Sequence, residues 1–480
     1  MPAMNTPPLE TLRLDIMPPG EIAGRLPPGL RLGTATSSYQ IEGAVEEDGR
    51  GPANWDVFSQ RPGAIADASS GAGACDHYHR MPADVALMAD LGMEVYRFSI
   101  AWPRIMPEGR GRIEERGLAF YDRLVDELLG SGIEPVPTLY HWDLPQALED
   151  AGGWPNRDTA GRFADYASVV VDRLGDRVTR WATLNEPWCA SHLGYHAGVH
   201  APGVTDAGAA MAAAHTLLRA HHLGGQAIRA ASSTAQVGVV LNVTTVRPQD
   251  DTEADAEAVR ALDAVRNRWW LDGCLRGTLP EDAVAAWESL SVADADGVVV
   301  GPDIREGDLD GPAPDWLGVN YYYPEIVTAR SDGEVLPDAC AAPARGIAPQ
   351  GETTAMGWPI DPAGFTELLL RIHRDYDPVP IAITENGAAF DDQDPRDGRL
   401  PDPRRTAFLS AHLSALADAI DAGVPVTDYM AWSLMDNFEW ALGYGKRFGI
   451  VHVDYETQAR TPKDSARWYA EVVSALQSRR

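Results

Sequence analysis

Two glutamates, Glu186 and Glu385, each directly follow a short apolar run in this 480-residue chain. Short apolar runs of this kind are typical of buried parallel strands. A pair of carboxyl groups can break a glycosidic bond, with one group donating a proton and the other attacking the sugar. A single glutamate at a strand end is more often an ion-pair partner or a neighbour of a helix N-terminus, so the pair needs support from other residues.

Other strand-like runs also contain, end in or are followed by polar or aromatic residues. In chain order these are Gln40, Arg97, His141, Trp142, Asn185, Asn320, Tyr322, Trp432, Glu439 and Trp440. Tryptophan rings stack on the apolar face of a pyranose, while amide, imidazole and carboxyl groups hydrogen-bond its hydroxyls. Together with the two glutamates, this set predicts a sugar-binding site.

The elements that must position these residues are eight apolar or β-branched runs, which alternate with segments of helical periodicity. The expected strands are Arg31–Tyr39, Glu94–Ile100, Glu134–Tyr140, Arg180–Asn185, Gln236–Leu241, Trp316–Tyr321, Pro380–Thr384 and Thr427–Leu434. Amphipathic helices are expected between them, for example over Leu118–Leu129 and Arg404–Ala422. We therefore predict an α/β fold, a single (β/α)8 TIM barrel whose catalytic groups come from the carboxyl ends of different strands.

The chain is expected to hold one catalytic barrel domain, residues 30–480. Residues 1–29 are rich in proline and lack the basic and apolar regions of a secretory signal, so a flexible N-terminal lead-in is expected there. Val292–Pro314 and Arg330–Trp358 are rich in Asp, Gly and Pro and are expected to be elaborated βα loops, which usually shape a binding site. Asp391–Pro403 is expected to be a loop within the domain rather than a linker.

The composition limits the classes of partner. The formal net charge is −30 and the basic residues are scattered singly, which argues against nucleic acids and anionic membranes as partners. No apolar stretch of the sequence is long enough to span a bilayer. The four cysteines form no CxxC pair and have no histidine at zinc-ligand spacing, so reduced, structural thiols in a cytoplasmic protein are expected.

Two motifs make the sugar-site hypothesis specific. Thr183-Leu-Asn-Glu-Pro-Trp188 and Ile383-Thr-Glu-Asn-Gly387 resemble the acid/base and nucleophile motifs of glycoside hydrolase family 1. Further blocks that resemble the family, in its order, start at Thr34, Cys75, Tyr96, His141, His200, Gly318, Trp432 and Arg447. They run from about Leu30 to the C-terminus, so the resemblance covers nearly the whole chain.

The resemblance implies a role for each residue at a matching motif position. It implies Glu186 as the acid/base and Glu385 as the nucleophile, with Arg97 and Asn320 orienting the nucleophile. Trp358 resembles the tryptophan that forms the floor of the leaving-group subsite. The glycone-binding residues that it implies are Gln40, His141, Asn185, Tyr322, Trp432, Glu439 and Trp440.

The implied activity is that of a retaining β-glucosidase, which needs no cofactor and removes terminal non-reducing β-D-glucosyl residues. The implied substrates are small β-glycosides or cello-oligosaccharides, as in cellulose degradation. Retention requires two carboxyl groups about 5–5.5 Å apart. Arg97 and the Tyr322 hydroxyl are expected to favour the anion of Glu385, and that charge is expected to keep the proton on Glu186.

Substrate preference is only partly indicated. A carboxylate at Glu439 would accept hydrogen bonds from sugar hydroxyls but repel a 6-phosphate, which disfavours phospho-β-glycosidases. Glu186 is a carboxyl group where the family's thioglucosidases typically lack the acid, which favours an O-glycosidase. His196, Met106 and Leu442 are less typical of their motifs, and they leave the natural leaving group open. Activity on galactosides and fucosides and the oligomeric state are open as well.

Two other classes of protein stay as alternatives. A non-catalytic sugar-binding barrel would keep the aromatic residues but lose one carboxylate, whereas both are present here. A metal-dependent hydrolase needs His and Asp ligands at several strand ends, and only His141 qualifies. His77 and His79, beside Asp76, are expected to be structural rather than metal ligands.

Overall fold

The computed structural model describes residues 15–289, 303–336, 344–376, 379–392 and 395–480. At its centre is a closed barrel of parallel strands in the order β1-β12-β11-β7-β5-β4-β3-β2. These strands are β1 (Arg31–Ala35), β2 (Val95–Ser99), β3 (Glu134–Tyr140), β4 (Arg180–Asn185), β5 (Gln236–Leu241), β7 (Trp316–Asn320), β11 (Ile381–Asn386) and β12 (Val426–Trp432). The predicted (β/α)8 barrel and each of its eight predicted strands are confirmed.

Several strands end one to four residues from the expected position, and the differences at β1 and β11 concern the site. β1 stops at Ala35, because Ser38–Ile41 forms the short helix α2, so the predicted strand is too long at its carboxyl end. β11 continues to Asn386 and therefore includes Glu385, which pairs in register with Asn320 of β7. This pairing places Glu385 and Asn320 side by side at the carboxyl end of the barrel.

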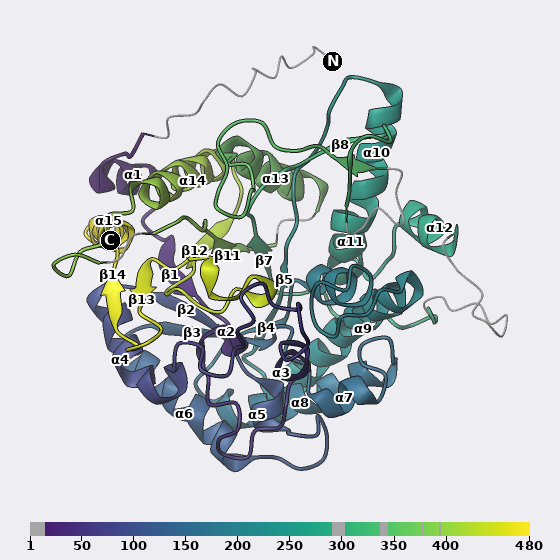
Figure 1. Ribbon diagram of the computed structural model, residues 1–480, viewed down its shortest axis with the longest axis horizontal. Helices are drawn as coiled ribbons and strands as arrows, with labels where there is room; N and C mark the ends of the chain where they lie inside the picture. The colour runs from purple at the N-terminus through teal and green to yellow at the C-terminus, as the bar shows by residue number, and fades with distance from the viewer. Residues whose placement is uncertain (1–14, 290–302, 337–343, 377–378, 393–394) are drawn as a thin grey trace.

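Helices surround the barrel (Figure 1). They are α1 (Pro19–Arg25), α2 (Ser38–Ile41), α3 (Asn54–Phe58), α4 (His77–Asp90), α5 (Trp102–Ile105), α6 (Glu115–Gly130), α7 (Gln146–Asp150), α8 (Asp158–Leu174), α9 (Ala207–Ala231), α10 (Glu253–Asp263), α11 (Trp269–Leu275), α12 (Glu281–Ser289), α13 (Pro362–Asp375), α14 (Pro403–Asp421) and α15 (Asp464–Gln477). In α6 the buried residues Leu118, Tyr121, Val125 and Leu128 recur every three or four residues, as one face of a helix requires. The predicted helices over Leu118–Leu129 and Arg404–Ala422 correspond to α6 and α14.

Part of the expected lead-in is ordered helix instead. Residues 19–25 form α1, which packs against α14 and α15, with Ile22 and Ala23 fully buried (Figure 1). The side chain of Arg479, near the C-terminus, donates hydrogen bonds to the carbonyl oxygens of Ala23 and Leu26. The prediction of a flexible segment is therefore wrong for α1, because its apolar residues are covered by the last helix of the chain. Residues 1–14 lie outside the described residues.

The long connections contain small sheets. One has the order β6-β8-β10-β9, and a two-stranded pair lies near the C-terminus. Their strands are β6 (Val246–Pro248), β8 (Glu325–Thr328), β9 (Glu334–Val335), β10 (Arg345–Gly346), β13 (Val451–Val453) and β14 (Arg460–Pro462). The predicted loop Arg330–Trp358 thus carries two short strands, although residues 337–343 lie outside the described residues, as do 292–302 of the other predicted loop. Asp391–Pro403 connects β11 to α14, with residues 393–394 not described.

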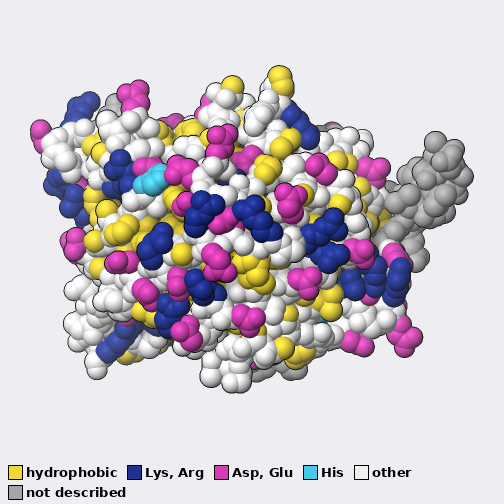
Figure 2. Space-filling model, turned by 90° about the horizontal axis from the view of Figure 1, so that it is seen from below, with side chains coloured by type: hydrophobic (Ala, Val, Ile, Leu, Met, Phe, Trp, Pro, Cys, Tyr) yellow, Lys and Arg dark blue, Asp and Glu magenta, His cyan; other side chains and the backbone are white. Residues whose placement is uncertain are grey.

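On the face of the molecule that Figure 2 shows, acidic and basic side chains are interspersed, and hydrophobic side chains lie in small groups between them. The overall negative charge is therefore not gathered into one patch on this face. Among the helices of the described residues, none has the length and apolar character needed to cross a membrane.

Candidate active site

The site lies at the carboxyl end of the barrel, where the chain turns sharply after three strands. The φ angles are 43° at Glu186, 77° at Trp142 and 47° at Trp440. Positive φ is unfavourable for residues with a side chain, and such strain clusters at functional sites. All three side chains line one pocket, so these turns aim them into it.

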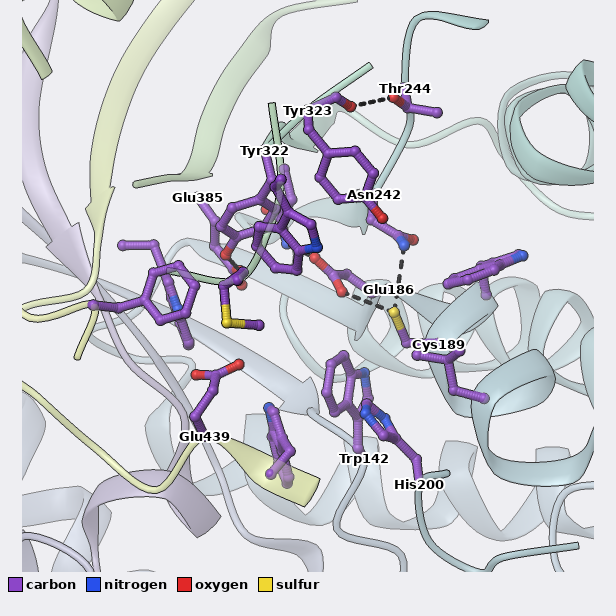
Figure 3. Close-up of a pocket in the computed structure, with 18 of the residues that line it drawn as sticks. Trp142, Glu186, Cys189, His200, Asn242, Thr244, Tyr322, Tyr323, Glu385 and Glu439 are labelled. Carbon is purple, nitrogen blue, oxygen red and sulfur yellow. Dashed lines mark hydrogen bonds between the residues drawn. The ribbon is translucent and has the colours of Figure 1, made fainter. Parts of the chain in front are cut away.

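The pocket is drawn in Figure 3. Its space between atoms, including the part that is open to solvent, amounts to about 900 Å³. The predicted residues that line it are His141, Glu186, Asn320, Tyr322, Trp358, Glu385, Trp432, Glu439 and Trp440. The remaining predicted residues, Gln40, Arg97 and Asn185, hydrogen-bond to residues that line it. The structure therefore brings all the predicted site residues together.

Glu385 is held by one cationic and one phenolic donor. Arg97 Nη1 donates to Glu385 Oε1 over 2.7 Å, and the Tyr322 hydroxyl donates to Oε2 over 2.5 Å. Arg97 is fully buried within β2 and Glu385 is 3% exposed, so this ion pair is shielded from water. Arg97 Nη2 also donates to Asn185 Oδ1 over 2.6 Å, which links the ends of β4 and β11.

Among the described residues, the side-chain donors to Glu186 are both neutral. Asn320 Nδ2 donates to Glu186 Oε1 over 2.7 Å, and the Cys189 thiol donates to Oε2 over 3.1 Å. The amide of Asn320 is oriented in turn by Thr384, whose hydroxyl donates to Asn320 Oδ1 over 2.7 Å. Asn320 is also a hydrogen-bonding neighbour of Glu385, so it lies between the two carboxyl groups.

The different partners give the two carboxyl groups different proton affinities. Burial, together with the negative charge of Glu385, raises the pKa of Glu186 to about 7. Burial also raises the pKa of Glu385, but the Arg97 guanidinium and the Tyr322 hydroxyl oppose that rise. Since Arg97 bonds Glu385 directly, the pair holds its negative charge on Glu385 and its proton on Glu186 near neutral pH.

The expectation that Glu439 is a carboxylate is corrected by its surroundings. Burial and the charges of Glu385 and Glu186 raise the pKa of Glu439 to about 8. The amide of Gln40 donates to Phe438 O over 3.0 Å and reaches Glu439 Oε2 only at 3.4 Å, so it opposes the shift weakly. At neutral pH Glu439 is therefore mostly protonated, which weakens the charge argument against phosphorylated sugars.

One wall of the pocket is aromatic. His141 lies nearly parallel to Trp432 and Trp440, at ring-centroid distances of 5.9 and 6.0 Å. Burial and the charge of Arg97 lower the pKa of His141 well below its usual value, so the ring is neutral. Its Nε2 is 3.0 Å from Asn185 Nδ2, and its buried Nδ1 has no hydrogen-bond partner among the described residues. This wall thus offers flat apolar faces and one unused polar atom, which suits a sugar ring.

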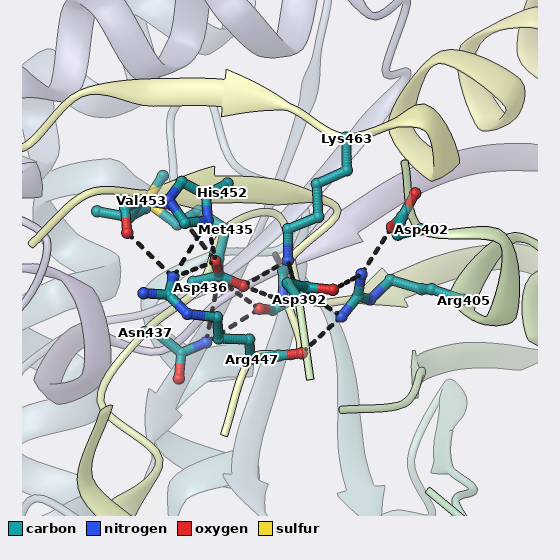
Figure 4. Close-up of polar contacts among 12 residues, drawn as sticks. Asp392, Asp402, Arg405, Met435, Asp436, Asn437, Arg447, His452, Val453 and Lys463 are labelled. Carbon is teal, nitrogen blue, oxygen red and sulfur yellow. Dashed lines mark hydrogen bonds and ion pairs between the residues drawn. The ribbon is translucent and has the colours of Figure 1, made fainter. Parts of the chain in front are cut away.

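The segment that carries Glu439 and Trp440 is held by a buried ionic network (Figure 4). Asp436 accepts hydrogen bonds from Lys463 Nζ and Arg447 Nη1, both over 2.7 Å. Lys463 is fully buried, and its ammonium also bonds Asp392. The network lies just before Glu439 in the sequence and ties this segment to the C-terminal part of the chain.

Several pocket residues were not predicted. They include Cys189, Asn242, His200, Tyr323, Met356 and Phe448. Cys189 could have been found, because it follows Glu186 by one helical turn. The others come from connections after different strands, and their approach to the pocket depends on loop conformations that periodicity does not reveal.

Within the described part of the chain, no group of three or more His, Cys, Asp or Glu side chains is arranged to hold a metal ion. His77 Nδ1 is 2.8 Å from Asp84 Oδ2, and His79 Nδ1 is 2.6 Å from Asp76 Oδ1. Each of these histidines therefore has a carboxylate partner of its own.

Comparison with known proteins identifies the family of this chain. The model of glycosyl hydrolase family 1 matches residues 22–477. The chain is 50% identical to thermostable beta-glucosidase B of Thermobispora bispora, over 93% of this chain and 90% of that protein. It is 43% identical to the bifunctional beta-D-glucosidase/beta-D-fucosidase of Bifidobacterium breve, over 93% of this chain and 98% of that protein.

A solved structure extends the likeness to three dimensions. The psychrophilic beta-glucosidase BglU from Micrococcus antarcticus matches with a TM-score of 0.90 and 42% identity, covering 96% of this chain and 99% of that one. Sequence and fold agree over nearly the full length of both chains. This chain therefore belongs to glycosyl hydrolase family 1.

Proposed function

We propose that this family 1 enzyme is a retaining β-glucosidase, with Glu385 as the nucleophile and Glu186 as the acid/base. The observation that carries the proposal is the unequal surroundings of two buried carboxyl groups in one pocket. Glu385 is bonded by a guanidinium and a phenol, whereas Glu186 has only amide and thiol donors. This difference supplies one anion and one acid at the same pH, as retaining hydrolysis requires.

In the first step, a carboxylate oxygen of Glu385 bonds to the anomeric carbon and the bond to the leaving-group oxygen breaks. The electron pair of that bond goes to the leaving-group oxygen, which takes the proton of Glu186. Esterification removes the charge of Glu385, so Glu186 becomes a stronger acid and stays ionised. In the second step Glu186 takes a proton from water, the hydroxide oxygen bonds the anomeric carbon, and Glu385 leaves as the carboxylate.

For substrates, we propose small β-D-glucosides and cello-oligosaccharides, with fucosides as a second class. His141 Nδ1 and the protonated Glu439 can donate hydrogen bonds to sugar hydroxyls, and Trp432 and Trp440 offer stacking faces. The relative named for both glucosidase and fucosidase activity supports the second class. For location we propose the cytoplasm, because Cys75, Cys189 and Cys274 are buried free thiols.

The test combines a chelator with a mechanism-based trap. Purified enzyme is incubated with EDTA and a chromogenic aryl β-glucoside, and turnover is expected to persist. An activated 2-deoxy-2-fluoro-β-glucoside should then inactivate the enzyme by esterifying Glu385, which peptide mass mapping locates. The matched control, Glu385→Gln, should take up no label.

Three outcomes would contradict the proposal. Binding of glucosides without turnover would favour a sugar-binding barrel, and loss of turnover in EDTA that added metal restores would favour a metal-dependent hydrolase. A label on a residue other than Glu385 would overturn the assignment of the nucleophile.

A further inference from the structure

The second carboxylate oxygen of Glu186 has an unusual partner, the thiol of Cys189. Cys189 begins the π-helix η1 (Cys189–Leu193), and its backbone N–H donates to Glu186 O over 2.9 Å. The side chain turns back over the same turn, so that Sγ lies 3.1 Å from Glu186 Oε2. Single π-helical turns often occur at functional sites, because they move one side chain out of α-helical register.

The direction of the thiol proton is set by Asn242. Asn242 follows β5, and its Nδ2 donates to Cys189 Sγ over 3.4 Å. A thiol has a single proton and accepts weakly, so with an amide proton on the sulfur its own proton points to Glu186. Figure 3 shows the sulfur of Cys189 between Asn242 and Glu186, with a dashed line to each.

The sulfur is a donor rather than an anion. Burial and the charge of Glu186 raise the pKa of Cys189 well above its usual value, so the thiol keeps its proton. A donor on Oε2 stabilises ionised Glu186 more than protonated Glu186. A thiol is a weak hydrogen-bond donor. The Cys189 thiol can therefore lower the pKa of Glu186 slightly, while Glu186 still keeps its proton until substrate binds.

We infer that Cys189, oriented by Asn242, is a positioning residue that tunes proton transfer by Glu186 in both steps of the reaction. The inference rests on the proposed role of Glu186 as the acid/base. Other titratable or charged groups that face Glu186 and Cys189 are Glu385, Glu439, Tyr322, Arg97 and Arg266. A change confined to Cys189 leaves all of them in place.

The test is to measure kcat/KM as a function of pH. The alkaline limb of this profile reports the loss of the proton of Glu186 in the free enzyme. Cys189→Ala removes a donor to the anion, so the limb should move to higher pH by about half a unit. Cys189→Ser supplies a stronger donor in the same place, so the limb should move to lower pH. Asn242→Leu should act like Cys189→Ala but more weakly, and it should add nothing to Cys189→Ala in the double variant.

Cys274→Ala is the control, because Cys274 is a buried thiol in α11 that does not line the pocket, so its replacement should leave the alkaline limb unchanged. Thermal melts identify any variant that fails to fold, and the opposite shifts of the Ala and Ser variants separate tuning from damage. The inference would be overturned if wild type, Cys189→Ala and Cys189→Ser had the same alkaline limb. It would also be overturned if the limb moved in the same direction in both variants. If wild type hydrolyses no β-glucoside, the proposed function fails instead.

Discussion

At the scale of single residues, two side chains of the same type have different partners in one pocket. Glu385 bonds Arg97 at 2.7 Å, and Glu186 bonds the neutral amide of Asn320 at the same distance. Both groups are buried, so the difference in their partners decides which one carries the charge. The roles that we propose for them follow from these neighbours.

Replacing Glu186 by Ala should remove the proton donor but leave Glu385 able to attack. Turnover of cellobiose, whose leaving group needs a proton, should fall by roughly 10²–10⁴-fold. An aryl glucoside with an activated leaving group should still form the glycosyl-enzyme. Azide should then accelerate its turnover, because the small anion can enter the space left by Glu186 and needs no general base. The product to be measured is β-glucosyl azide.

The stereochemistry supplies the control for this experiment. Glu385→Ala has lost the nucleophile, so azide should attack the anomeric carbon directly and give the α-azide. Full activity of Glu186→Ala on cellobiose, or the same azide anomer from both variants, would contradict the assignment of roles.

At the scale of elements, the segment after β12 must hold Glu439 and Trp440 in the pocket without being a strand or a long helix. The ionic network around Asp436 does this from inside the molecule (Figure 4). Lys463, just before α15, bonds both Asp436 and Asp392, so one ammonium group holds two connections together. An isolated buried charge is costly, so removal of one member leaves the others uncompensated.

Lys463→Met should therefore lower the free energy of unfolding by about 3–5 kcal/mol, the range for breaking a buried ion pair. It should also reduce kcat/KM for glucosides, because the segment that carries Glu439 loses its support. Denaturant unfolding curves and initial rates measure the two effects. Arg399→Ala is the matched control: Arg399 is 68% exposed in its ion pair with Asp464, and its loss should cost less than about 1 kcal/mol. Equal stability losses in the two variants would contradict the buried-network argument.

At the scale of the whole molecule, the two ends of the described chain meet. β1 pairs with β12 and closes the barrel, and outside it α1 packs on α15. Ile22 of α1 is fully buried at this contact. No α1 residue lines the pocket, so the contact should contribute to stability and not to the reaction.

Ile22→Ala should lower the free energy of unfolding by about 2–5 kcal/mol, the usual cost of this truncation in a core. The value of kcat should stay unchanged, because the strand tips that carry the site are not altered. Glu21→Ala, at an exposed position in the same helix, is the control and should change neither quantity measurably. Equal unfolding midpoints for both variants would mean that α1 does not contribute to the stability of the barrel.

The sequence by itself determined the barrel and the pair of glutamates with the predicted residues around them, although not every residue that lines the pocket. Strand positions follow from runs of apolar residues that must be buried on both faces, and this signal is local, so all eight strands could be predicted. The motifs around Glu186 and Glu385 are local as well. Because a closed barrel brings every strand tip to one rim, the predicted site residues had to meet once the barrel formed.

Only the tertiary structure decided several further interactions of those residues. The raised pKa of Glu439 comes from burial beside Glu385 and Glu186, which are distant in the sequence. Asn242 reaches Cys189 because β4 and β5 are neighbouring strands, and α1 is ordered because α15 covers it. Burial, hydrogen bonds and charge interactions all depend on distances in space, and apolar periodicity along the chain carries no information about those distances.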